Sequence, residues 1–172
     1  MTNIDKNRNL ILSAFFIALG ILIPMLFHFV GLGPMLLPMF WPVAISAFFL
    51  PLSYSVLVGL LTPIISTLMT GMPPPPILYK MIFELGCLSS IINVLYHKTR
   101  WGTFWIIFFA LFCTMAAGLL GAYAIAPIFG FPPELYAIAA LLKNLPGLLI
   151  MIVFIPIFLN RIIKEYAFKK RT

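Results

Sequence analysis

Residues 10–30 read LILSAFFIALGILIPMLFHFV, a stretch that contains no Asp, Glu, Lys or Arg. The hydrocarbon core of a bilayer is about 30 Å thick, and a helix needs about 20 mostly apolar residues to cross it. Because lipid offers no hydrogen-bond partners, the backbone of such a stretch satisfies its own polar groups by forming a helix. The stretch therefore predicts a transmembrane helix.

Five further apolar segments follow, separated by breaks that are rich in Gly and Pro or carry charge. We expect helices over about 10–30, 37–50, 54–70, 77–96, 101–127 and 134–163. The break over 71–76 reads GMPPPP and cannot be helical throughout. Pro146-Gly147 is expected to kink the last segment or to divide it. The sequence predicts an all-α integral membrane protein, a single membrane domain over residues 1–172 with six transmembrane helices.

The composition supports lipid as the solvent of this chain. Hydrophobic residues make up 63% and charged residues only 9%, against about 25% charged in a soluble domain. The net charge of +7 would suit a nucleic-acid partner. We expect no nucleic acid, because the basic residues flank apolar spans, where membrane topology explains them.

The positions of Lys and Arg predict the orientation in the membrane. Of the 11 Lys and Arg residues, all but Lys80 and Lys143 lie near the two ends of the chain or in segment 97–100. The loops over 31–38, 71–76 and 127–134 contain none. Cytoplasmic segments carry the excess of Lys and Arg. We therefore expect a multi-pass protein of the prokaryotic cell (inner) membrane, with both termini cytoplasmic.

Three charged residues remain inside apolar surroundings, and we expect them in the outer half of the membrane. Lys80 and Glu84 are four residues apart and share one helix face. Lys143-Asn144 lies about nine residues, or about 13 Å, below the outer end of the last segment. Intramembrane charges usually face a cavity or a partner. They either line an outward-facing pocket, where the surplus positive charge suits an anionic ligand, or form a structural pair while Lys143 snorkels outward.

Aromatic residues and one histidine are expected near the same outer face. Phe40, Trp41, Tyr79 and Tyr136 form either an interfacial aromatic belt or a platform that stacks on a flat ligand. His28, at the outer end of the first helix, is either interfacial or a ligand contact. The candidate substrate-binding residues are Lys80, Glu84, Lys143, Asn144, Trp41, Tyr79, His28 and Phe40.

Small residues recur on the first and third predicted helices. Ala14 and Ala18 are four apart with Gly20 close by, and Ser55 and Gly59 repeat the spacing. Small residues at this spacing let another helix approach closely in lipid. The surface serves either a partner subunit or packing within the chain, and Ala14, Ala18 and Gly20 are the candidate docking residues.

These features together resemble the substrate-binding subunits (S components) of the energy-coupling factor (ECF) vitamin transporters of prokaryotes. The resemblance covers nearly the whole length. It is carried by Ser13-Ala14-x-x-x-Ala18, Leu37-Pro38-Met39-Phe40-Trp41-Pro42-Val43, Pro51-Leu-Ser-Tyr-Ser-Val-Leu-Val-Gly59, Thr70-Gly71-Met72-Pro73, Leu145-Pro146-Gly147 and Ile155-Pro156. One departure is Phe40, where the family carries a histidine.

The resemblance implies a fold, a ligand class and partners. Such subunits bind a vitamin or a vitamin precursor near the outer face, and their Ala-x-x-x-Ala surface docks on a membrane scaffold subunit, EcfT. Two cytoplasmic ATPase subunits then drive release inside the cell. Carried over, Ala14 and Ala18 become docking residues, and Lys80, Glu84, Lys143 and Asn144 fall in the region of the pocket.

We therefore expect a binding subunit rather than an enzyme, with no cofactor, no metal and no catalytic residue. The bound molecule could be nicotinate, pyridoxine, a thiamine precursor or pantothenate. A small structural or channel-type subunit is the alternative, with the Lys/Glu group holding an assembly together. An intramembrane enzyme is less favoured, because the sequence contains no paired intramembrane carboxylates and no His-Glu-x-x-His signature.

Overall fold

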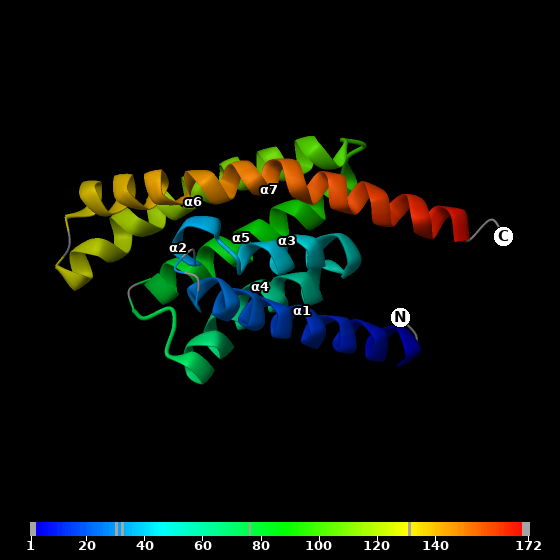
Figure 1. Cartoon of the computed structure of the whole chain (residues 1–172), viewed down its shortest axis with the longest axis horizontal. Coiled ribbons are helices and arrows are strands. Elements are labelled where there is room, and N and C mark those ends of the chain that lie inside the picture. The colour runs from blue at the N-terminus through cyan, green and yellow to red at the C-terminus, as the bar shows by residue number, and fades with distance from the viewer. Residues whose placement is uncertain (1–2, 30, 32, 76, 131, 170–172) are drawn as a thin grey trace.

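The computed structural model describes residues 3–29, 31, 33–75, 77–130 and 132–169. Within these residues every regular element is a helix (Figure 1). The elements are α1 (Asn3–Phe29), α2 (Gly33–Leu36), α3 (Phe40–Phe49), α4 (Leu52–Thr70), α5 (Ile77–Lys98), α6 (Thr103–Ile125), the 3-10 helix η1 (Ala126–Phe129) and α7 (Pro133–Lys169).

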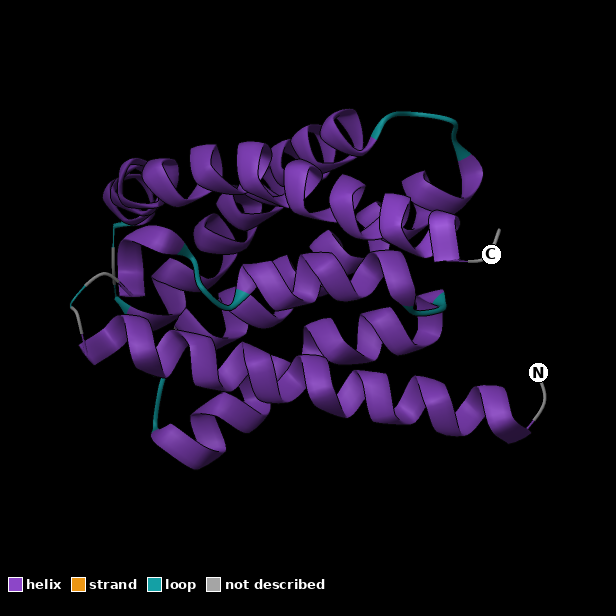
Figure 2. Cartoon of the chain, turned by 45° about the vertical axis from the view of Figure 1, so that its right-hand side comes forward, coloured by secondary structure: helices purple, strands orange, loops and turns teal. Residues whose placement is uncertain are grey.

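The helices run back and forth along one axis. Helices α1, α4 and α6 lead away from the end of the bundle where both chain termini lie, and α3, α5 and α7 return to it (Figures 1 and 2). We call that end the terminal end. The opposite end holds α2 and the α4–α5 and α6–α7 connections, and we call it the loop end.

Five helices of the described residues are long and apolar enough to cross a membrane. They are α1, α4, α5, residues Thr103–Ala124 of α6 and residues Leu142–Arg161 of α7. The remaining apolar helix, α3, has 10 residues and rises about 15 Å, half of a hydrocarbon core. The expected sixth transmembrane helix is therefore a short helix in the structure, too short to span alone.

The expected helix over 37–50 also begins later than its pattern indicates. Leu37 has a φ of 49° and precedes Pro38, which disfavours helical backbone in the residue before it. The break therefore falls between α2 and α3, and α3 begins at Phe40. Gly33, expected within the break, begins α2 instead.

The last predicted helix is not divided. It continues through Pro146 and Pro156 as α7, one helix of 37 residues. Gly147 lies against α2, because a Cβ on it would come within 2.7 Å of the Met35 carbonyl oxygen. Gly147 therefore allows α7 to lie close to α2, and it does not end the helix.

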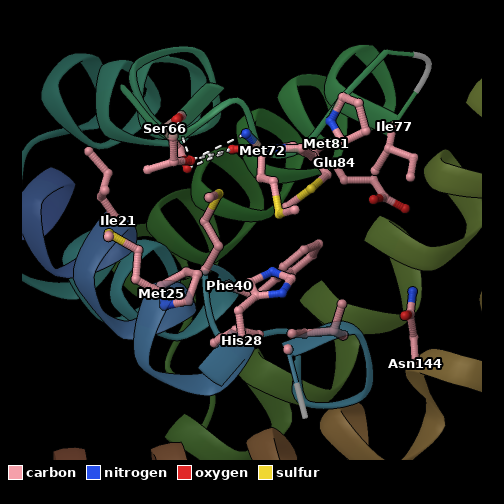
Figure 3. A pocket seen from close by; sticks show the side chains of 18 of the residues that line it. Ile21, Met25, His28, Phe40, Ser66, Met72, Ile77, Met81, Glu84 and Asn144 are labelled. Carbon is pink, nitrogen blue, oxygen red and sulfur yellow. Dashed lines mark hydrogen bonds between the residues drawn. The ribbon is translucent and has the colours of Figure 1, made fainter. Parts of the chain in front are cut away.

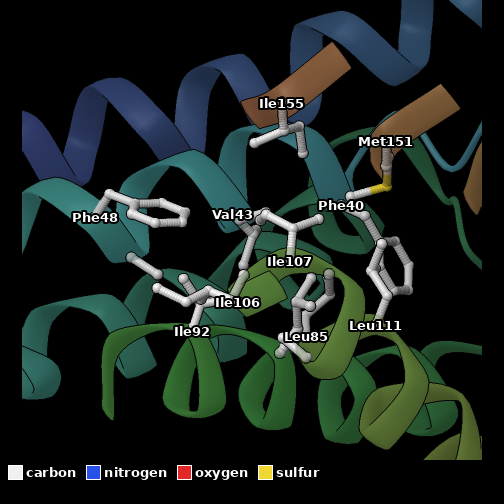
Figure 4. Close-up of a cluster of buried hydrophobic side chains, with 14 of the residues drawn as sticks. Phe40, Val43, Phe48, Leu85, Ile92, Ile106, Ile107, Leu111, Met151 and Ile155 are labelled. Carbon is white, nitrogen blue, oxygen red and sulfur yellow. The ribbon is translucent and has the colours of Figure 1, made fainter. Parts of the chain in front are cut away.

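The core surrounds α3, whose apolar side chains meet those of α5, α6 and α7 (Figure 4). The residues that are at most 2% exposed there include Phe40, Val43, Ala47, Leu85, Ile92, Ile106, Ile107, Leu111, Met151 and Ile155. The end of α3 is tied to α5 by Asn93, whose Nδ2 donates to the Ala47 and Leu50 carbonyl oxygens at 2.9 and 2.8 Å. This agrees with the interhelical role that polar residues have in lipid.

Candidate functional site

A cavity of about 770 Å³ lies at the loop end of the bundle (Figure 3). This volume is within the range of small-molecule pockets, about 300 to 1,000 Å³. Residues of α1 to α5 and of α7 line it, together with the α2–α3 and α4–α5 connections. It therefore joins segments that are far apart in the sequence.

A buried ion pair forms part of the wall. Lys80 Nζ lies 2.6 Å from Glu84 Oε1, one turn further along α5, and the two side chains are 11% and 2% exposed. Burying one such charge alone is costly, so the pairing makes both tolerable at this depth. The carboxylate is accommodated by Gly118 of α6, where a Cβ would come within 2.9 Å of Glu84 Cδ.

Helix α7 supplies two further polar residues to the wall, Lys143 and Asn144. Lys143 is exposed and Asn144 is half-buried. Among the side chains that the structure describes, no carboxylate pairs with Lys143. The described lining residues thus carry one more positive than negative charge.

His28 and Phe40 line the cavity from its other side. The His28 ring packs on Gly33, where a Cβ would come within 3.0 Å of the imidazole. Phe40 is 1% exposed, so its ring belongs to the core as well as to the cavity wall.

The α4–α5 connection is held in place by hydroxyl groups at the end of α4. Ser66 Oγ donates to the Met72 carbonyl oxygen and Thr67 Oγ1 donates to the Pro73 carbonyl oxygen, both at 2.9 Å. Gly71 closes α4 with a φ of 72°, a left-handed conformation that favours glycine. These contacts fix Met72 and Pro73 against the cavity.

The methionines of this cavity were not among the binding residues expected from the sequence. Met25, Met39, Met72 and Met81 line it, each from a different segment of the chain. The one available signal was the number of methionines, 9 in the chain. Their gathering depends on how the helices pack, which that number does not report.

Two of the predicted aromatic contacts do not line the cavity. Trp41 Nε1 donates to the Leu36 carbonyl oxygen at 3.0 Å, and its ring packs on Phe154 with centroids 5.3 Å apart. Tyr79 is 51% exposed, since it is one residue from Lys80 and is therefore turned to another face of α5. The side chain of Tyr136 is outside the part of the chain whose side chains are described.

The candidate docking residues separate into two groups. Ala14 and Ala18 are exposed, four residues apart on α1. Gly20 is buried, and a Cβ on it would collide with Thr62 of α4. Gly20 thus serves packing between α1 and α4, and it is not part of the exposed face.

The second small-residue pair also packs within the chain. Gly59 lies on α5, where a Cβ would come within 2.5 Å of the Leu85 carbonyl oxygen, and Ser55 Oγ donates to the Ser89 carbonyl oxygen at 3.5 Å. Ser55 and Gly59 thus join α4 to α5.

Comparison with known proteins gives one match. The family described as "ECF transporter, substrate-specific component" matches residues 8–167. Neither a curated protein nor a solved structure matches the chain. That family consists of transporter components and is not an enzyme family, and the five long apolar helices agree with a multi-pass membrane protein. The chain therefore belongs to the family of substrate-specific components of ECF transporters.

Proposed function

We propose that this chain captures a small vitamin or vitamin precursor in the cavity at the loop end. One observation carries the proposal: Lys80, Glu84, Lys143, Asn144 and His28 meet in a single space of about 770 Å³. Ligand pockets combine a mostly apolar lining with a few convergent polar groups. A structural Lys–Glu pair alone would need no such space beside it.

The loop end faces the outside of the cell in this proposal. Lys6, Arg8, Lys98 and Arg100 lie on segments at the terminal end, and an excess of Lys and Arg is typical of the cytoplasmic side. The short α3 then completes one passage between the two sides together with α2. This gives six passages, with both termini inside a prokaryotic cell.

Delivery of the cargo requires partners, and we propose an EcfT scaffold and two cytoplasmic ATPase subunits. The exposed Ala14–Ala18 face of α1 is the surface that we assign to EcfT. Alanines four residues apart allow the close backbone approach that helix association in lipid uses. Neither residue lines the cavity, so binding and docking use separate surfaces.

Native mass spectrometry of the protein purified without partners tests the proposal. We expect a co-purifying molecule of small mass in stoichiometric amount, or tight binding of nicotinate, pyridoxine, pantothenate or a thiamine precursor. A protein that carries no compound and binds none of these would support the alternative, a structural or channel-type subunit.

A further inference from the structure

We propose that the cavity selects a monocarboxylate that carries an aromatic or other apolar body. This inference rests on the proposed function and names its substrate class. It follows from the charge balance of the wall and from the position of its described charged residues, which come from α5 and α7.

The charge balance concerns three residues of α5 and α7. Glu84 offsets the charge of Lys80, to which it is bonded at 2.6 Å. Lys143 has no carboxylate partner among the side chains that the structure describes. Because Lys143 is exposed on the cavity wall, its ammonium is available to a ligand, and a ligand that brings one negative charge supplies a partner of opposite charge.

The same balance favours a carboxylate over a phosphate monoester. A phosphate monoester carries about −1.5 to −2 charges at pH 7, so binding it would leave negative charge uncompensated. A carboxylate carries one charge and accepts several hydrogen bonds. The Lys143 ammonium and the Asn144 amide supply hydrogen-bond donors at the cavity wall. Lys80 has three N–H donors, of which Glu84 takes one.

The remaining wall is mostly apolar, with His28, Ser66 and Thr70 as its polar members, and it suits a ring. Four methionines and Phe40 contribute to it, and methionine sulfur makes favourable contacts with aromatic rings.

The charged residues among the described lining residues come from α5 and α7, whereas α1 contributes apolar residues and the polar His28. In Figure 3 Glu84 lies on the same side of the cavity as Asn144, and Ile21 and Met25 lie on the opposite side. A ligand with an anionic end and an apolar end matches this division.

Matched ligand pairs test the class on the purified full-length chain in lipid nanodiscs. The pairs are nicotinate with nicotinamide, pantothenate with panthenol, and 4-pyridoxate with pyridoxine, with pyridoxal phosphate as the dianion. For a pair that binds, we expect the acid to bind about tenfold or more tightly than its neutral partner. The dianion should bind more weakly than the monocarboxylate.

Three variants assign this preference to the charge on α7. Lys143→Met should abolish the preference for the acid, while Lys143→Arg should retain it. Lys98→Met at the terminal end is the matched control and should leave it unchanged. The compound extracted from the purified protein gives a second readout, and a carboxylic acid is expected.

The possible outcomes distinguish a failure of this inference from a failure of the proposed function. Equal or tighter binding of the neutral partners, or a preference that persists in Lys143→Met, overturns the inference while capture of a small molecule stands. Extraction of a neutral compound, a cation or a phosphate ester would likewise overturn the inference, while capture of a small molecule would stand. A protein that yields no compound and binds no member of any pair loses both the proposed function and this inference.

Discussion

Gly118 of α6 lies directly against the side-chain carboxylate of Glu84 on α5. A Cβ at position 118 would come within 2.9 Å of Glu84 Cδ and 3.2 Å of Glu84 Cγ. The carboxylate is 2% exposed and holds Lys80 at the cavity wall. The absence of one side chain on α6 thus makes room for the ion pair of the candidate binding site.

The first prediction is that Gly118→Ala moves or expels the Glu84 carboxylate. Overpacking of this kind lowers the free energy of unfolding by about 1–3 kcal/mol, and we expect ligand binding to weaken with it. Thermal unfolding in detergent and ligand titration measure the two effects. Gly121→Ala is the matched control, because the atom nearest to its Cβ is Phe83 Cδ1 at 3.9 Å. Identical melting of the two variants would contradict the assigned contact.

The second prediction separates stability from binding at the ion pair. Lys80→Met should lower the free energy of unfolding by about 3–5 kcal/mol, because it leaves Glu84 buried and unpaired. Adding Glu84→Met should restore most of that stability, since apolar replacements of buried pairs are often neutral. Ligand binding should be lost in Lys80→Met and should stay lost in the double variant. Wild-type affinity in the double variant would show that the pair is structural and does not contact the ligand.

The third prediction concerns Asn93 at the end of α3. Asn93→Ala removes both donors to the Ala47 and Leu50 carbonyl oxygens, and we expect a loss of about 2–4 kcal/mol in the free energy of unfolding. Asn160→Ala is the control, because its bond to Thr103 is exposed, and it should change stability by about 0.5 kcal/mol or less. Equal melting temperatures for the two variants would argue against the tie between α3 and α5.

The fourth prediction concerns the exposed face of α1. Replacing both Ala14 and Ala18 by Leu should abolish uptake of the cargo in cells while affinity in the purified protein stays unchanged, because neither residue lines the cavity. Ala116→Leu is the control on an exposed position of α6 and should spare both. Normal uptake by the double variant would remove this face as the docking surface.

Much of the helix order could be predicted from the sequence, because a long apolar run by itself indicates a helix in lipid. Residues 10–29 of the first predicted helix lie within α1, which ends at Phe29. The helix over 37–50 was predicted to begin too early, although Pro38 marks the break in the sequence. The contact between α2 and Gly147 could not be predicted in this way, because it joins segments more than 100 residues apart.

The candidate site was predicted best where charge was involved. Lys80, Glu84 and Lys143 stand out because lipid makes each of them costly, and all three line the cavity. Aromatic residues carry no such signal, since Trp41 and Tyr79 would be equally stable in a wall or at a lipid interface. The direction in which a side chain points around its helix axis decides whether it lies in the cavity wall or at the lipid interface. Gly118 was missed because a glycine on an apolar helix gives no sign of the residue that it faces.

The short length of α3 has a consequence for the size of the cargo. A helix that filled its position through a whole hydrocarbon core would need about 20 residues, and α3 has 10. Met39 and Phe40, where α3 begins, line the cavity. Helix α2 and the connection to α3 therefore stand where a full-length helix would continue, and the cavity lies beside them. One added turn of helix at the start of α3 would therefore narrow the space for the bound molecule, while the other helices of the bundle keep their places.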